Sequence, residues 1–166
     1  LFADPKGDPV AETSILVEDF EPERLALTVD TAATAIDPAK PTSVDLEARY
    51  LYGAAAPDLA VEGEVILKPT DTLASFKGYK FGLAEENIEP SRDSLDIDAT
   101  TDEDGKATFD VSLPDLRQST KPWSATLVLR VADTNGRAIE RTIDRPVLPT
   151  GESIGIRPQV DGDVAE

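Results

Sequence analysis

Apolar and polar residues alternate one by one along much of this chain, and this alternation constrains its fold most strongly. The longest run is Trp123–Val131, in which every odd-numbered position carries an apolar side chain. A second run places Val44, Leu46 and Ala48 on one side, with charged residues between them. Successive side chains of a β-strand point to opposite faces, so these runs predict strands that are buried on one side.

The same alternation predicts further strands, and glycines and prolines separate them. The other alternating apolar positions are Leu25, Leu27 and Val29, then Tyr50 and Tyr52 in continuation of the Val44 run, then Leu95 and Ile97, then Ala107, Phe109, Val111 and Leu113. Thirteen prolines and ten glycines leave little room for long helices, and helical spacing is limited to one turn near residues 83–87. We therefore predict an all-β fold, an antiparallel β-sandwich in which two sheets bury their apolar faces against each other.

One predicted strand mixes charged and apolar residues on the same face. Arg137, Arg141 and Arg145 alternate there with Ile139 and Ile143. An edge strand tolerates this mixture, because arginine stems cover apolar surface while their charged heads stay in water. The alternative is that the three arginines contact an acidic neighbouring domain. The sequence leaves both interpretations open.

Acidic residues outnumber basic ones by 33 to 16, which gives a net charge of −17. Nucleic-acid phosphates and anionic membrane surfaces repel such a chain, so we expect neither as a partner. Nine carboxylates lie between Glu85 and Asp104, with only Arg92 in opposition. This stretch is either a solvated surface, a cation site or a docking patch for a basic partner.

Three short segments share the pattern of a hairpin turn. Asp4–Gly7, Asp102–Gly105 and Asp133–Gly136 each begin with aspartate and end with a glycine that accepts a positive φ. The middle segment is superficially similar to a calcium loop, with Asp98, Asp102 and Asp104 as possible ligands. The position that requires a bidentate carboxylate is occupied by Val111, however, so we predict a turn.

Several kinds of chemistry are excluded because the chain contains neither cysteine nor histidine. Disulfides, thiol nucleophiles, the usual zinc sites and Ser-His-Asp triads all require these residues. Paired carboxylates remain as a source of hydrolysis, but none lies in a recognisable motif. We expect no enzyme, and no catalytic residue, metal ligand or cofactor. The chain starts at Leu1 without any methionine, signal peptide or membrane-length apolar stretch, so we expect a segment of a longer protein.

Two kinds of loop complete the pattern. Residues 76–82 place Phe76, Tyr79 and Phe81 close together between glycines. These rings either plug one end of the sandwich or offer an exposed surface on which a sugar stacks. The segments Asp30–Ser43 and Ile88–Asp98 are predicted as accessible surface loops.

Three stretches together resemble the bacterial α2-macroglobulins, large exported relatives of the eukaryotic protease-trapping inhibitors. They are SILVEDFEPERLAL (Ser14–Leu27), ARYLYGAAAPDLAVEG (Ala48–Gly63) and SIGIRP (Ser153–Pro158) with Asp161 and Gly162 after it. The resemblance implies that residues 1–20 are the last hairpin of a preceding macroglobulin (MG) domain. Residues 21–150 would form one complete MG domain, a fibronectin- or immunoglobulin-like sandwich of about seven strands. Residues 151–166 would begin the following MG domain.

The resemblance also implies a function. This chain would be a non-catalytic structural module whose partners are the neighbouring MG domains, while proteases are the targets of the whole parent. The junction residues Glu18, Asp19 and Phe20, together with the three arginines above, would contact those neighbours. The family's thioester joins a cysteine to a glutamine, and no such cysteine exists here. We expect the parent to be periplasmic, with or without a lipid anchor, or extracellular. The alternative is a free-standing adhesive or ligand-binding surface sandwich that binds carbohydrate or calcium.

Overall fold

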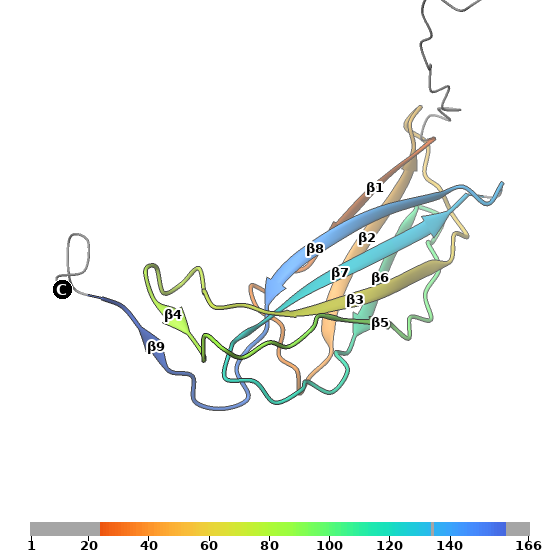
Figure 1. The fold of residues 1–166 in the computed structure, drawn as a ribbon. Coiled ribbons are helices and arrows are strands. Elements are labelled where there is room, and N and C mark those ends of the chain that lie inside the picture. Colours follow the sequence, from red (N-terminus) through yellow and green to blue (C-terminus); the bar gives the residue numbers. More distant parts are fainter. Residues whose placement is uncertain (1–23, 134, 159–166) are drawn as a thin grey trace, which may run out of the picture.

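A computed structural model describes residues 24–133 and 135–158, and it consists of β-strands and connecting loops (Figure 1). Among these residues there is no helix, and so none with the length and hydropathy of a membrane span. All strand pairs are antiparallel. The strands are β1 (Leu25–Asp30), β2 (Thr42–Tyr50), β3 (Val61–Pro69), β4 (Lys80–Phe81), β5 (Ser91–Ser94), β6 (Lys106–Val111), β7 (Trp123–Ala132), β8 (Ala138–Pro146) and β9 (Gly155–Ile156). The predicted all-β class is confirmed.

Seven of these strands form a sandwich of two sheets. One sheet has the order β1-β2-β6, and the other has the order β5-β3-β7-β8. The chain crosses between the two layers after β2, after β5 and again after β6, as an immunoglobulin-like sandwich requires (Figure 1). The predicted antiparallel sandwich of about seven strands is therefore confirmed. The short strands β4 and β9 pair with each other outside it.

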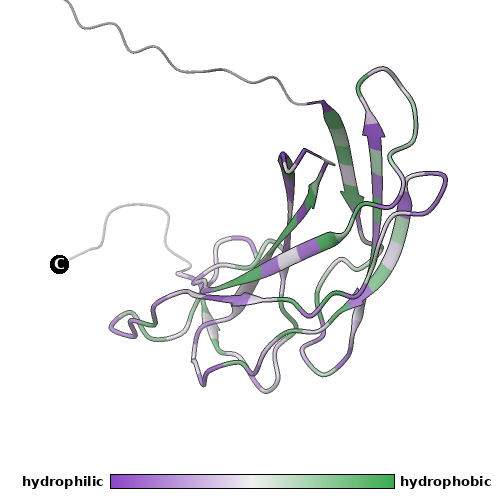
Figure 2. Ribbon diagram, turned by 90° about the vertical axis from the view of Figure 1, so that its right-hand side faces the viewer, coloured by the Kyte–Doolittle hydropathy of each residue, from purple (hydrophilic) through white to green (hydrophobic). Residues whose placement is uncertain are grey.

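The core follows the alternation of the sequence. In β7, the side chains of Ala125, Leu127, Leu129 and Val131 are buried, and the indole of Trp123 is 9% exposed at the start of the strand. Figure 2 shows the alternation as bands of high and low hydropathy along the strands. Burial of a valine or leucine side chain contributes about 1.5–3 kcal/mol relative to its exposure. A one-residue slip in strand pairing would turn this face to solvent, so burial fixes the register of β7.

Both acidic turns within the described residues form as predicted. Asp102 Oδ1 accepts hydrogen bonds from the backbone amides of Asp104 at 2.9 Å and Lys106 at 2.8 Å. Asp133 Oδ1 binds two amides in the same way in the β7–β8 hairpin. The glycines at the ends of these turns have φ values of 76° and 80°. In residues 24–133 and 135–158, no three acidic side chains meet in the arrangement of a metal site. The segment Asp4–Gly7 lies outside the described residues.

The strand predicted at Leu95–Ile97 is wrong, because β5 ends at Ser94. Both apolar side chains cover Gly63 of β3 instead, where a Cβ would lie 2.7 Å from Ile97 Cδ1 and 3.3 Å from Leu95 Cδ1. Beyond Ser94 the backbone keeps single hydrogen bonds to β3, from Leu95 N to Gly63 O and from Val61 N to Ala99 O, both at 2.9 Å. The alternation therefore reflects side-chain packing over a glycine beside an irregular edge. β5 itself forms within the predicted loop Ile88–Asp98, as an edge strand of the four-stranded sheet.

The strand predicted from the Val44–Tyr52 alternation also ends earlier than predicted. β2 stops at Tyr50, and Tyr52 lies in the following turn, 80% exposed. The two rings still stack, with centroids 5.3 Å apart and planes inclined by 7°.

Two other short predictions need correction. β6 ends at Val111, three residues before Pro114, so Leu113 lies beyond the strand. Near residues 83–87, Glu86 N donates to Leu83 O at 3.2 Å and closes a single turn, and no helix is formed there.

The predicted surface loop Asp30–Ser43 contains a core residue. Ile36 is fully buried, and its backbone amide donates to Pro146 O at 2.9 Å. Its carbonyl accepts from Leu148 N at 2.8 Å, so the loop pairs with the chain that leaves β8. A single isoleucine in an alanine- and threonine-rich segment gives no periodic signal, which explains why the sequence did not reveal this contact.

Candidate interaction surface

β8 is the outer strand of the four-stranded sheet and lies beside β1 of the other sheet (Figure 1). Ile139 and Ile143 are buried, while Arg137, Arg141 and Arg145 are half-buried on the same face. The predicted edge position is therefore confirmed. An edge strand accommodates half-buried arginines, because their stems are apolar while their charged heads stay in water.

Arg145 makes its contacts within the domain. Its Nε donates to Ala33 O at 2.7 Å, and a terminal nitrogen lies 3.5 Å from Thr31 O. Both acceptors belong to the loop after β1, so this guanidinium joins the two sheets. Arg141 Nη1 donates to Glu140 O at 2.7 Å. Contact of these arginines with a neighbouring domain stays a prediction, and Glu18, Asp19 and Phe20 lie outside the described residues.

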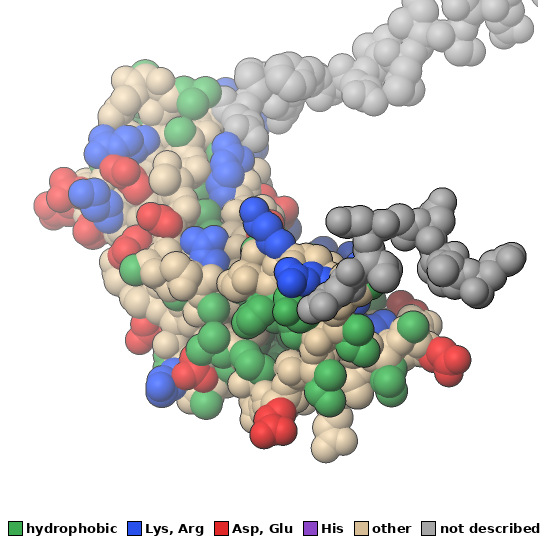
Figure 3. Space-filling model, turned by 90° about the vertical axis from the view of Figure 1, so that its left-hand side faces the viewer, with side chains coloured by type: hydrophobic (Ala, Val, Ile, Leu, Met, Phe, Trp, Pro, Cys, Tyr) green, Lys and Arg blue, Asp and Glu red, His purple; other side chains and the backbone are tan. Residues whose placement is uncertain are grey.

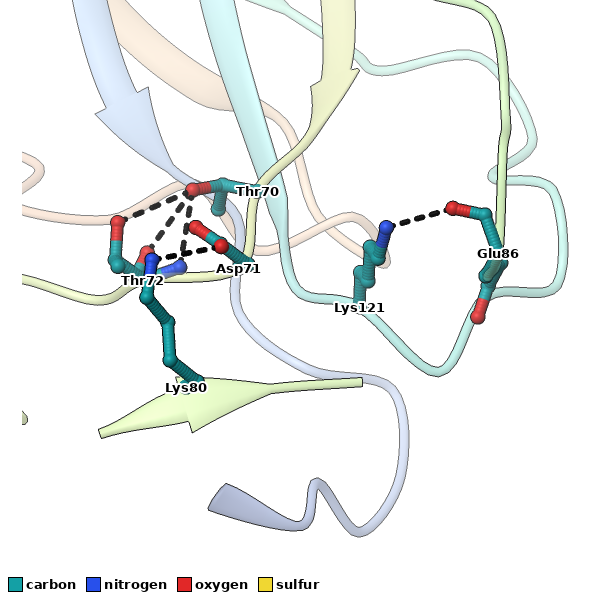
Figure 4. Close-up of polar contacts among 6 residues, drawn as sticks. All are labelled: Thr70, Asp71, Thr72, Lys80, Glu86 and Lys121. Carbon is teal, nitrogen blue, oxygen red and sulfur yellow. Dashed lines mark hydrogen bonds and ion pairs between the residues drawn. The ribbon is translucent and has the colours of Figure 1, made fainter. Parts of the chain in front are cut away.

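A second surface includes the aromatic segment 76–82 and also residues that the sequence did not indicate. Residues 70–88, here termed the flap, leave the end of β3, include β4 and project from the sandwich (Figure 1). Within the flap, Lys80 Nζ lies 2.7 Å from Asp71 Oδ2 (Figure 4). Phe81 N also donates to Asp71 O at 2.9 Å, so these contacts close the flap on itself. The hydrogen bond from Lys80 lowers the pKa of the Asp71 carboxyl. The first anchor is the hydrogen bond from Thr70 N to Pro122 O at 2.8 Å, which ties this end of the flap to the start of β7.

The second anchor holds the other end of the flap to the loop before β7. The Glu86 carboxylate accepts hydrogen bonds from the amide and the hydroxyl of Thr120. Lys121 Nζ donates to Glu86 O at 2.6 Å (Figure 4), and Leu83 N donates to Thr120 Oγ1 at 2.9 Å. The Thr120 hydroxyl, followed by the Ser119 hydroxyl, lowers the pKa of the Glu86 carboxyl. Both ends of the flap are thus hydrogen-bonded to the residues that precede β7.

The three flap aromatics form a cluster of their own. The Phe76 ring meets the Tyr79 ring at 6.3 Å and the Phe81 ring at 5.8 Å, both edge to face. Phe81 is buried but does not belong to the sandwich core, so the predicted plug in the end of the sandwich is wrong. A sugar-stacking surface requires rings exposed in a row, and the edge-to-face contacts do not provide one.

The flap pairs with the segment that follows β8. Lys80 lies opposite Ile156 and Phe81 lies opposite Gly155 in the β4–β9 pair. A Cβ at Gly155 would lie 2.7 Å from Phe81 Cε1, so only a glycine fits there without a shift of the ring. The Arg157 guanidinium lies 5.1 Å from the centre of the Tyr79 ring, a cation–π contact.

An apolar groove of about 560 Å³ lies between the flap and the chain after β8. Its lining includes Leu73, Phe76, Tyr79, Phe81 and Leu148. Figure 3 shows hydrophobic side chains gathered on the side of the molecule that bears β4 and β9. The large apolar side chains exposed near it are Phe76, Leu83, Leu148, Ile154 and Ile156. Such a patch is typical of a surface that another protein part covers.

Comparison with known proteins identifies the sandwich. Residues 23–149 match the sequence model described as the bacterial alpha-2-macroglobulin MG5 domain. The chain belongs to the bacterial alpha-2-macroglobulin family. This confirms the family that the sequence resembles, and residues 24–133 and 135–149 of the MG5 match hold all seven strands of the sandwich.

The relatives are much longer than this chain. An alpha-2-macroglobulin of Escherichia coli K12 is 28% identical over 145 residues, which cover 86% of this chain and 9% of the relative. The crystal structure of a Salmonella alpha-2-macroglobulin that has reacted with methylamine superposes with a TM-score of 0.61 at 26% identity, over 86% of this chain and 9% of that one. Trypsin-activated alpha-2-macroglobulin from E. coli gives a TM-score of 0.59 at 26% identity, over 86% and 10%. The chain thus spans about a tenth of the length of these relatives.

The domain limits stay predictions. The matched range 23–149 contains β1 to β8, whereas β9 lies after it. The assignment of residues 1–20, 21–150 and 151–166 to three consecutive domains rests on the resemblance of the junction sequences.

Proposed function

We propose that this MG5 domain is a non-catalytic structural module of an alpha-2-macroglobulin-like parent that traps and inhibits proteases. The observation that carries the proposal is the combination of a complete sandwich with a chain that spans about a tenth of its relatives. Its distinctive surfaces are a strand edge and an apolar patch, which suit contact with other domains. One of the relatives is known in a trypsin-activated form, which supports proteases as targets of the parent.

The ionisable groups of the described residues support a non-catalytic role. A general acid at neutral pH requires a raised carboxyl pKa. The described carboxyls with a clearly shifted pKa all have it lowered, chiefly by the Ala39 amide, the Lys80 ammonium, the Thr120 hydroxyl and the Arg137 amide; they are Asp37, Asp71, Glu86 and Asp133. Each hydrogen bond stabilises the charged form and suits a turn or an anchor.

The two surfaces suit different neighbours. We infer that the arginine-bearing edge of β8, with Glu18, Asp19 and Phe20, contacts the preceding domain of the parent. The flap side suits the domain that follows, because the chain leaves the sandwich there.

We also propose that the parent is exported to the periplasm, with or without a lipid anchor, or to the cell exterior. Fractionation of cells that produce the tagged parent tests this location, and a cytosolic parent would contradict it.

Protease inhibition by the parent tests the function directly. We expect the full-length parent to reduce trypsin cleavage of a large protein substrate, and the 166-residue chain alone to leave it unchanged. Stoichiometric inhibition by the isolated chain would contradict a purely structural role. A parent that leaves trypsin fully active on the large substrate would contradict the assignment of protease trapping.

A further inference from the structure

β9 presents two chemically different faces. On one face, Gly155 fits against the Phe81 ring and Arg157 lies over the Tyr79 ring. Side chains of successive strand residues point to opposite faces, so Ile156 points away from Phe81. Its side chain is 70% exposed, and that of the nearby Ile154 is 77% exposed. The docked face thus contacts the flap of this domain, whereas the outer face carries apolar side chains that the described residues leave exposed.

The docked face has the features of specific strand recognition. Backbone pairing with β4 supplies affinity, and the close fit at Gly155 supplies specificity. The flap that receives β9 is tied to the chain before β7 at one end by the hydrogen bond from Thr70 N to Pro122 O and at the other by the Glu86–Thr120 contacts. The pairing of Phe81 with Gly155 gives β9 one register on the flap, and this register sets the direction in which the chain leaves the domain.

We propose that β9 is a strand shared by two domains. Gly155 and the adjacent Arg157 dock on the flap of this domain, and Ile156 with the neighbouring Ile154 is buried by the domain that follows in the parent chain. This inference deepens the proposed function and rests on its statement that the chain is one module among several. The shared strand fixes the angle at which the following domain leaves the MG5 domain.

The following domain is the occupant that the structure favours over a second copy or a protease. β9 comes after the end of the MG5 match at residue 149, so the chain beyond it starts directly at the apolar patch. A domain that continues the same chain meets that patch in an intramolecular contact, at an effective concentration that a separate molecule lacks. A protease or a second copy arrives from solution without that advantage.

The test compares thiol reactivity at β9 in the full-length parent and in the 166-residue chain. We would introduce Ile156→Cys and measure its rate of maleimide labelling, with the modified peptide identified by mass spectrometry. If the following domain covers Ile156, labelling in the parent should be slower by about tenfold or more than in the chain alone. Glu103→Cys, at the tip of the Asp102–Gly105 turn, serves as the control and should label at similar rates in both.

Hydrogen exchange of residues 154–157 in the unmodified parent provides a second measurement that needs no substitution. Strong additional protection in the parent supports the shared strand. Equal labelling and equal exchange in both proteins would overturn it, as would equal slowing of the Glu103→Cys control. Protection that appears in the 166-residue chain as its concentration rises would indicate a second copy and would also overturn it. A parent that protects Ile156 but fails to inhibit trypsin would contradict the proposed function alone, and the reverse result would contradict the shared strand alone.

Discussion

Gly155 lies against the ring of Phe81, so closely that an added Cβ would come within 2.7 Å of Cε1. These residues face each other in the β4–β9 pair and are 74 positions apart, at 81 and 155, in the chain. The contact ties the segment after the MG5 match back to the flap. It also makes the position of this segment sensitive to a single methyl group.

We expect Gly155→Ala to weaken the β4–β9 pair. The added methyl requires Phe81 to shift, and overpacking of this kind costs about 1–3 kcal/mol. Hydrogen exchange at residues 154–157 should become faster, while exchange in β7 stays slow. Gly151→Ala is the matched control, because a Cβ at Gly151 meets nothing within 4 Å. Replacement of Phe81 by leucine should restore part of the protection lost in Gly155→Ala, and failure of both effects would contradict the close fit.

Gly63→Ala should destabilise the sandwich itself. The added Cβ would lie 2.7 Å from Ile97 Cδ1 and 3.0 Å from Leu129 Cδ2, between β3 and the residues that cover it. We expect a loss of about 1–3 kcal/mol in the free energy of unfolding, measured by urea denaturation. Gly151→Ala again serves as the control. An unchanged urea midpoint would show that Leu95 and Ile97 move away freely.

Thr101→Val should lower the free energy of unfolding strongly, although it conserves the shape of the side chain. The buried Thr101 hydroxyl donates to Ala56 O at 2.7 Å and accepts from Leu59 N at 2.9 Å. Valine keeps the shape but leaves two buried backbone groups without a partner, each at a cost of about 1–3 kcal/mol. Thr108→Val removes an exposed hydrogen bond to Asp45 Oδ1 and should have a much smaller effect. Equal urea midpoints for the two variants would contradict this explanation.

Acid should weaken the β7–β8 turn through Asp133. Hydrogen bonds from the amides of Arg137 and Asn135 lower the pKa of the Asp133 carboxyl in the folded state. A lowered folded-state pKa means that this carboxylate stabilises the fold at pH values above its unfolded pKa of about 3.9, and that the contribution is lost as pH falls through the folded value. Asp133→Asn keeps an oxygen acceptor but does not titrate. The melting temperature of the natural chain should therefore fall more steeply below about pH 4 than that of Asp133→Asn, and parallel curves would contradict the role of Asp133.

Much of the sandwich was predictable because its strands are half-buried. The alternation at Trp123–Val131 and at Val44–Ala48 reports a buried face directly, and β7 and β2 lie where it indicated. The Asp102–Gly105 and Asp133–Gly136 turns follow from local chemistry, because one aspartate binds two nearby amides and a glycine accepts the positive φ. These features depend on residues within a few positions of each other.

The interaction surface was less predictable because its contacts join distant positions. Nothing in the pattern around Phe76–Gly82 indicates that Phe81 pairs with Gly155, or that Glu86 is held by Thr120. The sequence shows a glycine at position 155 but does not indicate that Phe81 is its partner. The arginine run of β8 predicts either an edge strand or a contact with an acidic domain, and the edge position is confirmed.

The sequence by itself determined the all-β class, the principal strands, the acidic turns and the family, because alternation, turn chemistry and junction motifs are local properties. Only the tertiary structure decided which edges meet, that Ile36 is a core residue, and that β9 docks on a flap anchored beside β7. The physical reason is that burial and backbone pairing depend on which surfaces come together in space. An apolar residue such as Ile36 or Ile156 has the same identity in the sequence whether it is fully buried or 70% exposed.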